Sequence, residues 1–366
     1  MSGQREGVGD LSGVRRLPGV AEIASHAEVK AAARDWERFS SDLQGDPDVR
    51  SYRQLPLEVD PPAHTAYRAV LAPIFARSAV LQHEPELEDA ARDLAQGFAS
   101  RGTTEAISDL AIPMVGASIA SAFGRAEDAA ELTSWGMSSW ETRPDGTRDS
   151  TRLDAYVERV LDEATARPGD DAFSRIVRAT VAGRALTRLE QVGMANLILA
   201  GGRDTVIHLL GGTIWALAAR PGERDRLRAA PNAIPRAIDE LVRFLSPLPR
   251  MERRVTQEAE GAWGRAAAED VVILGFARAN HDPSVFEAPG EIRLDRRSNP
   301  HVGFGNGPHT CIGLQLARLE AQTFLRVLLT EVPNWHLLPG ARMEVAEIEG
   351  SVVPIRFDAL PVATGQ

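Results

Sequence analysis

The sequence predicts a mainly α-helical protein that folds as a single domain with small β-sheets. Segments rich in Ala, Leu and Arg repeat apolar residues at the 3.6-residue spacing of a helix face. Strand signals are confined to short runs such as 271–274 and 352–357. No repeat or biased tract divides the 366 residues. We therefore expect one domain over 1–366, in which residues 1–34 form a short, atypical N-terminal segment.

Helices are expected along most of the chain. Apolar periodicity places them at about 64–76, 84–100, 105–124, 152–166, 222–229, 233–245 and 312–331. Residues 280–311 contain four prolines and several glycines, so this stretch is expected to be largely irregular. An irregular stretch of about thirty residues within a compact domain is usually functional.

The longest expected helix begins at Thr187, where the spacing to Glu190 is that of a capping box, and ends at Arg220-Pro221-Gly222. It would span roughly 48 Å, enough to cross the molecule. Its centre, Gly201-Gly202-Arg203-Asp204-Thr205, places two glycines and a carboxylate where a core helix should be most apolar. Two such glycines cost about 1–2 kcal/mol relative to alanine, so the break requires a functional reason.

Composition excludes several classes of function. The formal net charge is −10 and the sequence pI is about 5.4, which disfavours a general affinity for nucleic acid or an anionic membrane. A single cysteine excludes an internal disulfide and fits a reducing cytoplasm. The polar N-terminus lacks an apolar signal region, and no run of eighteen apolar residues occurs. We therefore expect a cytoplasmic protein without a membrane anchor.

The strongest chemical signal is the segment Phe304-Gly-Asn-Gly-Pro-His-Thr-Cys-Ile-Gly313, directly before an expected helix. Its glycines allow a tight loop to approach a flat ligand closely. Cys311 lies just before the helix N-terminus, where backbone amide dipoles lower a thiol pKa and favour a thiolate. Such a thiolate could ligate iron.

Three other roles are open to Cys311. A lone cysteine is most often a small buried hydrophobe, but its setting here favours a ligand. A nucleophile would need a general base, and His309, two residues away, is badly placed to act as one. A structural zinc site would need further ligands besides His309 and Cys311.

This segment resembles the haem-binding loop of the cytochrome P450 family, Phe-Gly-x-Gly-x-His-x-Cys-x-Gly, at every defining position. The resemblance implies a single-domain P450 fold, with haem b between the long central helix and the cysteine loop. It implies that Cys311 is the axial thiolate ligand of the iron, with Phe304 and Gly305 in the loop that contacts the cofactor. His309 would donate a hydrogen bond to a haem propionate.

Further segments resemble the same family in the same order along the chain. Glu240 and Arg243 match its Glu-x-x-Arg pair, which with Arg296 would brace the cysteine loop. The segment from Asp60 to Arg68 resembles the start of a propionate-binding helix, where His64 and Arg68 lie on one face at i, i+4. An ordinary solvated helix face is the alternative interpretation of this segment.

Two further assignments follow from the resemblance. Arg254 falls where the family has a propionate-binding arginine, on a strand. The glycine-broken helix centre resembles the oxygen-activation segment, in which Asp204 and Thr205 would govern proton delivery. His208, one turn further on, is expected to be a core or surface residue rather than a catalytic one.

The implied function is that of a bacterial haem-thiolate monooxygenase. It would activate dioxygen with electrons from NAD(P)H, supplied through a separate ferredoxin and ferredoxin reductase, and oxidise a small organic substrate such as a secondary metabolite. Arg77 and Arg318 are candidates for docking an acidic ferredoxin, against the alternative of ordinary surface charge. Two other functions remain open: a peroxygenase driven by peroxide, and a catalytically silent haem-binding sensor or recruitment protein. The intact Asp204-Thr205 pair argues against both.

The substrate itself is not identified by the sequence. Expected pocket residues, most of them apolar, are Leu199, Ala200, Leu248, Arg250, Met251 and Val352. The chain is short for the family between about Ser138 and Asp170, where helices that cover the substrate normally lie, so we expect a small or unusual lid.

Overall fold

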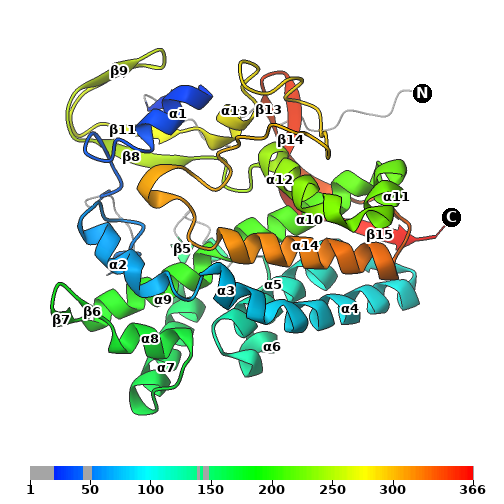
Figure 1. The fold of residues 1–366 in the computed structure, drawn as a ribbon, viewed down its shortest axis with the longest axis horizontal. Coiled ribbons are helices and arrows are strands. Elements are labelled where there is room, and N and C mark those ends of the chain that lie inside the picture. Colours follow the sequence, from blue (N-terminus) through cyan, green and yellow to red (C-terminus); the bar gives the residue numbers. More distant parts are fainter. Residues whose placement is uncertain (1–19, 44–51, 138–140, 143–147, 366) are drawn as a thin grey trace.

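The computed structural model describes residues 20–43, 52–137, 141–142 and 148–365. Most of the described chain is helical, and small sheets lie at its edges (Figure 1). The helices are α1 (His26–Ala32), α2 (Ala63–Leu71), α3 (Arg77–Val80), α4 (Glu84–Arg101), α5 (Ile112–Ala122), α6 (Ala129–Ser134), α7 (Thr151–Ala166), α8 (Ala172–Arg178), α9 (Arg188–Gly201), α10 (Asp204–Ala218), α11 (Pro221–Ala229), α12 (Ile234–Leu245), α13 (Phe276–Asn280) and α14 (Leu314–Glu331).

Most of the expected helices are confirmed. Those predicted at 84–100, 152–166, 222–229, 233–245 and 312–331 are α4, α7, α11, α12 and α14, with ends within two residues of the prediction. In Figure 1, α14 lies alongside α4, and α10 passes close to both α12 and α14. These helices enclose the main core, in which Leu210, Leu241 and Leu325 are fully buried.

The predicted central helix was correct in its extent but wrong in its continuity. Its N-terminus carries the expected capping box, in which the Thr187 amide donates to Glu190 Oε2 over 2.7 Å. However, α9 ends at Gly201 and α10 begins at Asp204, with Gly202 and Arg203 between them. Because glycine stabilises a helix poorly, the paired glycines allow the chain to interrupt its hydrogen-bond ladder at this point.

Two other predicted helices were wrong in part. The helix predicted at 64–76 ends at Leu71, and a separate short helix, α3, follows. The helix predicted at 105–124 begins instead as a strand, β3 (Thr103–Glu105), and continues through a π-helical turn before α5. Strand β3 pairs with β15 (Pro361–Thr364) from the far end of the chain, a partner that helical periodicity cannot indicate.

The sheets are more extensive than the sequence indicated. A four-stranded sheet has the order β1-β11-β8-β2, formed by Ala21–Ile23, Val271–Leu274, Met251–Val255 and Phe39–Ser40. Strand β12 (Trp335–Leu337) flanks β15, and a hairpin joins β13 (Arg342–Ile348) to β14 (Ser351–Ala359). The remaining short strands are β4 (Glu141–Thr142), β5 (Arg148–Asp149), β6 (Thr180–Val181), β7 (Arg184–Ala185), β9 (Ala259–Gly261) and β10 (Gly264–Ala266).

Part of the N-terminal segment packs into the fold. Residues 1–19 lie outside the described residues, but β1 pairs in parallel with β11, and α1 packs on α13. Ile23 and Val29 are fully buried in a second, smaller core beneath the four-stranded sheet. The part of the predicted lid at 138–140 and 143–147 lies outside the described residues.

The long irregular stretch is confirmed. After α13 ends at Asn280, the only helical residues before α14 are the 3-10 turn Gly307–His309. This stretch brings Cys311 to the N-terminal side of α14. None of the described helices is long and apolar enough to cross a membrane.

Candidate functional site

Cys311 lies in a tight loop that opens directly onto α14. Its backbone amide donates to the Phe304 carbonyl over 2.8 Å, which closes the loop. Gly305 and Gly307 have φ values of 72° and 73°, a conformation that favours glycine. A Cβ atom on Gly307 would also collide with the Ala33 carbonyl oxygen. The loop therefore needs these glycines, and it leaves the Cys311 side chain exposed.

The thiol of Cys311 is poorly solvated even though its side chain retains accessible surface. Burial by the surrounding protein raises the pKa of Cys311, while the Gly313 amide and the Arg68 charge lower it. In the protein alone, burial outweighs the Gly313 amide and the Arg68 charge. A thiolate would need a further positive charge, and a coordinated metal cation supplies one.

Four cationic or protonatable side chains meet beside this loop, and we call them the cradle: His64, Arg68, Arg253 and His309. The His64 and His309 ring centroids are 4.3 Å apart. Arg68 Nη2 donates to the Thr310 carbonyl over 2.7 Å, between His309 and Cys311. The cradle joins α2, β8 and the cysteine loop, which are far apart in the sequence.

The electrostatics of the cradle favour an anionic ligand. Burial, helped by Arg68, lowers the pKa of His64 to about 4. Burial, helped by Arg253, lowers the pKa of His309 to about 3. The ring nitrogens of His64 and Nε2 of His309 are buried without a hydrogen-bond partner in the described structure. Since buried polar atoms are normally paired, two carboxylates, such as the propionates of haem b, fit these donors.

Of the two neighbouring arginines on β8, Arg253 and not the predicted Arg254 lies beside the cysteine loop. Arg253 is 5% exposed and contributes to the low pKa of His309. Arg254 points to the opposite face of the strand, because successive side chains alternate. Its guanidinium lies 3.5 Å from Glu269, and its Nε is buried without a partner among the described residues. We therefore replace Arg254 by Arg253 in the proposed site; the period-two alternation of β8 was the signal that sequence reasoning missed.

The broken helix presents its polar centre toward accessible space. Gly201 is exposed and Asp204 and Thr205 are half-buried, whereas Val206 to Leu210 are buried. The Thr205 hydroxyl donates to the Gly201 carbonyl over 3.4 Å, which leaves it loosely held. A hydroxyl and a carboxylate in this opening can exchange protons with a ligand or with water.

His208 belongs to the core, in agreement with the sequence expectation. It is 5% exposed, and its ring lies 5.2 Å from that of Phe357. Burial lowers its pKa to about 4, so it is neutral at neutral pH.

Glu240, Arg243 and Arg296 form a buried cluster, which we call the brace. Glu240 and Arg243 are fully buried and bonded over 2.8 Å and 2.9 Å. Arg296 Nε donates to the same carboxylate over 2.9 Å. Arg243 also donates to the carbonyls of Asn280, Pro289 and Glu291 in the irregular stretch. The brace therefore ties α12 to the chain that leads to Cys311.

The expected pocket residues divide into two groups. Leu199 is 1% exposed and packs in the main core, so its assignment to the pocket was wrong. Leu248 and Val352 are 37% and 57% exposed, and Ala200, Arg250 and Met251 are half-buried. These five remain proposed pocket residues.

The two arginines expected to dock a ferredoxin differ in their contacts with the rest of the protein. Arg77 is exposed at the start of α3. Arg318 is already bonded to Asp239 over 2.9 Å and lies 5.0 Å from the Phe304 ring centroid. Arg318 therefore packs against the cysteine loop at Phe304. Arg77 is the better candidate for docking a ferredoxin.

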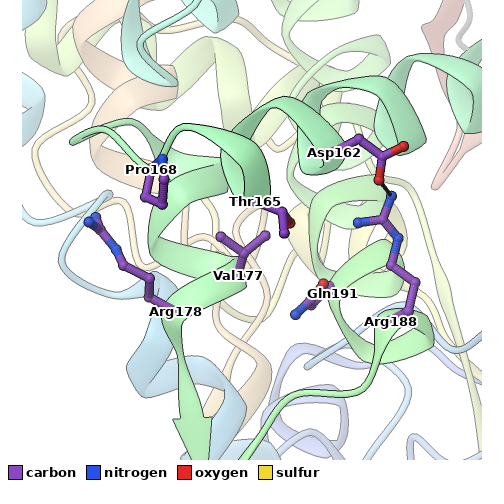
Figure 2. A pocket seen from close by; sticks show the side chains of 7 residues that line it. All are labelled: Asp162, Thr165, Pro168, Val177, Arg178, Arg188 and Gln191. Atoms are coloured by element: carbon purple, nitrogen blue, oxygen red, sulfur yellow. Dashed lines mark hydrogen bonds and ion pairs between the residues drawn. The ribbon is translucent and has the colours of Figure 1, made fainter.

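A separate surface hollow of about 500 Å³ lies between α7, α8 and the start of α9. Figure 2 shows that its lining is mixed, with Pro168 and Val177 beside polar side chains and Arg188 bonded to Asp162. Its lining contains none of the expected site residues.

Comparisons with known proteins agree with this geometry. A family model described as cytochrome P450 matches residues 233–353. The chain is 31% identical over 333 residues to a steroid C26-monooxygenase of Mycolicibacterium smegmatis, covering 88% of this chain and 83% of that protein. It is 30% identical over 329 residues to an erythromycin C-12 hydroxylase of Saccharopolyspora erythraea, covering 85% and 81%. The solved structure of a carbohydrate-active P450 superposes with a TM-score of 0.87 at 29% identity, covering 97% of each chain.

Proposed function

This chain belongs to the cytochrome P450 family and is a haem-dependent monooxygenase, and from that premise we propose that it oxidises a small, largely apolar organic molecule with electrons from a separate ferredoxin. The main observation behind the proposal is that the exposed Cys311 lies beside the cradle, where buried ring nitrogens of His64 and His309 have no hydrogen-bond partner in the described structure. One group with a metal centre and two carboxylates would satisfy both.

The residues present fit haem b, which when bound supplies the activation of dioxygen. Cys311 would hold the metal through Sγ, supported by the Gly313 amide. Arg68, Arg253 and the two histidines of the cradle would hold the propionates and fix the orientation of the ring. The Thr205 hydroxyl, which donates to the Gly201 carbonyl, would release that bond to hold a proton in the opening, and Asp204 would exchange protons with water there.

The substrate class is inferred from the pocket residues and the relatives. Ala200, Leu248 and Val352 are apolar side chains that retain accessible surface. The named relatives are a steroid C26-monooxygenase and an erythromycin C-12 hydroxylase. We therefore favour a secondary metabolite or a lipid-like molecule.

Electrons would come from NAD(P)H through a ferredoxin reductase and a ferredoxin in the cytoplasm. The exposed Arg77 offers an attractive charge to an acidic ferredoxin. The expected effect of Arg77→Glu is a slower rate of reduction at low ionic strength that converges with the parent rate at high salt.

The proposed haem site is tested by the absorption spectrum of the purified protein, oxidised and then reduced under carbon monoxide. We expect the long-wavelength Soret band of a thiolate-ligated haem, and its loss in Cys311→Ser. Circular dichroism of the variant should remain that of the parent, because the Cys311 side chain is exposed. Absence of bound haem, or an unchanged band in Cys311→Ser, would overturn the assignment.

The role of Thr205 is tested by Thr205→Ala. We expect this variant to retain haem and to consume NAD(P)H, but to release most of the reducing equivalents as hydrogen peroxide, because the hydroxyl that manages protons is lost. Peroxide and NAD(P)H are measured together with a surrogate ferredoxin and reductase. Peroxide release equal to that of the parent would remove Thr205 from proton delivery.

A further inference from the structure

Arg203 lies in the break between α9 and α10. It is a buried cation that belongs to neither the brace nor the cradle. Its side chain is 0% exposed. Burying a guanidinium is expensive unless it is paired and hydrogen-bonded. An apolar side chain such as Met would fill the same volume without this cost, so the charge requires an explanation.

The contacts of Arg203 all lead to the end of α6. Its Nη2 donates to the Gly136 carbonyl, and its guanidinium lies 5.8 Å from the Trp135 ring centroid. Trp135 packs edge-on against Tyr156 of α7, with ring centroids 5.2 Å apart. Arg203 Nε and Nη1 have no partner within the described part of the chain. One guanidinium therefore joins the helix break to α6, and through Trp135 to α7.

Arg203 is also coupled electrostatically to the acid beside it. Burial lowers its pKa to about 10, so it stays charged at neutral pH. Asp204, the next residue, raises that pKa and is therefore attracted to the cation. The other charge that acts on it is Arg152 on α7, which opposes the protonated form, while α6 contributes a carbonyl and an indole.

We propose that Arg203 is a positioning residue that fastens the C-terminal end of α6 to the break in the central helix, and so fixes the backbone that carries Asp204 and Thr205. The part of this inference that concerns Asp204 and Thr205 rests on the proposed function, because these are the residues proposed for proton delivery. The other part concerns the fold alone: release of Arg203 frees residues 129–137 and the break together.

Arg203→Met and Arg203→Lys test this proposal, with Arg224→Met as the matched control. Arg224 is likewise buried, at 5% exposure, donates to the Trp335 carbonyl and lies 4.7 Å from the Trp335 ring centroid, but it belongs to α11. Hydrogen–deuterium exchange is followed in the haem-loaded full chain. We expect Arg203→Met to speed exchange at least about tenfold in 129–137 and 201–208, and Arg224→Met to leave both segments unchanged.

The share of NAD(P)H electrons released as peroxide separates positioning from simple packing. With a surrogate redox pair, we expect this share to rise in Arg203→Met and to stay at the parent value in Arg224→Met, because only the first change releases the segment that carries Asp204 and Thr205. Arg203→Lys keeps the charge but lacks the planar fork, so it should also loosen α6. Arg203→Lys also serves as the test variant if Arg203→Met does not fold.

Two outcomes would overturn the proposal: exchange in 129–137 that stays at the parent rate in both Arg203 variants, or equal loosening in Arg224→Met. An unchanged share of peroxide in Arg203→Met would remove the effect of Arg203 on Asp204 and Thr205. If the parent protein binds no haem, the proposed function fails, but the exchange comparison on the full chain still decides whether Arg203 fastens α6.

Discussion

The brace is buried and the cradle is partly buried, and both are rich in arginine, yet they differ in how fully their buried polar atoms are paired. In the brace, the Glu240 carboxylate accepts from both arginines and from the Arg293 amide, and Arg243 donates through every nitrogen. In the cradle, three ring nitrogens of His64 and His309 have no partner in the described structure. A saturated cluster supports the fold by itself, whereas an unsaturated one is completed by a ligand.

The largest effect is expected from Glu240→Gln in the brace. Removing this carboxylate charge leaves Arg243 and Arg296 buried without a counter-ion. The free energy of unfolding should fall by about 3–5 kcal/mol. Urea denaturation followed by circular dichroism measures this loss.

The control for that measurement is Arg265→Ala, which removes one partner of an exposed pair with Glu258. Its stability should match that of the parent, because exposed ion pairs contribute little. A Glu240→Gln variant as stable as this control would show that the brace is not a structural element.

Glu320 on α14 extends the comparison, because it is a buried carboxyl group to which no arginine of the described residues donates a hydrogen bond. It accepts a hydrogen bond from Ser118 over 2.9 Å, and burial raises its pKa to about 8. The folded protein therefore binds a proton between about pH 4.5 and 8 that the unfolded chain releases. Stability from this group is fully present below about pH 4.5 and is lost as the pH rises through about 8.

Glutamine resembles the protonated acid but cannot ionise, so Glu320→Gln should not lose stability as the pH rises. We expect the variant to be more stable than the parent by about 2–3 kcal/mol at pH 7, and equal to it near pH 4. Denaturation at the two pH values measures the difference. A variant that is less stable at pH 7 would show that Glu320 is ionised and paired in the fold.

The smallest effect is expected in the cradle, and it should appear in ligand retention rather than in folding. Arg253→Met should weaken haem binding about tenfold or more, because a charge-assisted hydrogen bond contributes about 1.5–3 kcal/mol. Haem transfer to apomyoglobin measures this change. The haem-free chain should keep or gain stability, since a buried positive charge is removed.

Arg254→Met is the matched control on the same strand. Its haem affinity should stay close to that of the parent, because Arg254 is engaged with Glu269 on the other face. The reverse ranking of the two variants would restore the sequence-based assignment of Arg254.

Local signals in the sequence were reliable where a residue's role depends on its immediate neighbours. The capping box at Thr187 and the glycines before Cys311 act over a few residues, and the structure contains both features. The choice between Arg253 and Arg254 depended instead on which face of β8 meets the cysteine loop. Leu199 was misplaced for the same reason, since a helix face cannot be assigned until its neighbours are packed.

The sequence by itself determined the helical fold class, the cysteine loop, the motif order and therefore the family, because these depend on residue type and spacing along the chain. Only the tertiary structure decided which buried charged groups have all their nitrogens or oxygens hydrogen-bonded. Arg243 and Arg203 are both arginines within helical segments and fully buried, yet one donates through every nitrogen and the other leaves two unpaired. Pairing of buried polar groups depends on segments distant in sequence, and only folding brings these together.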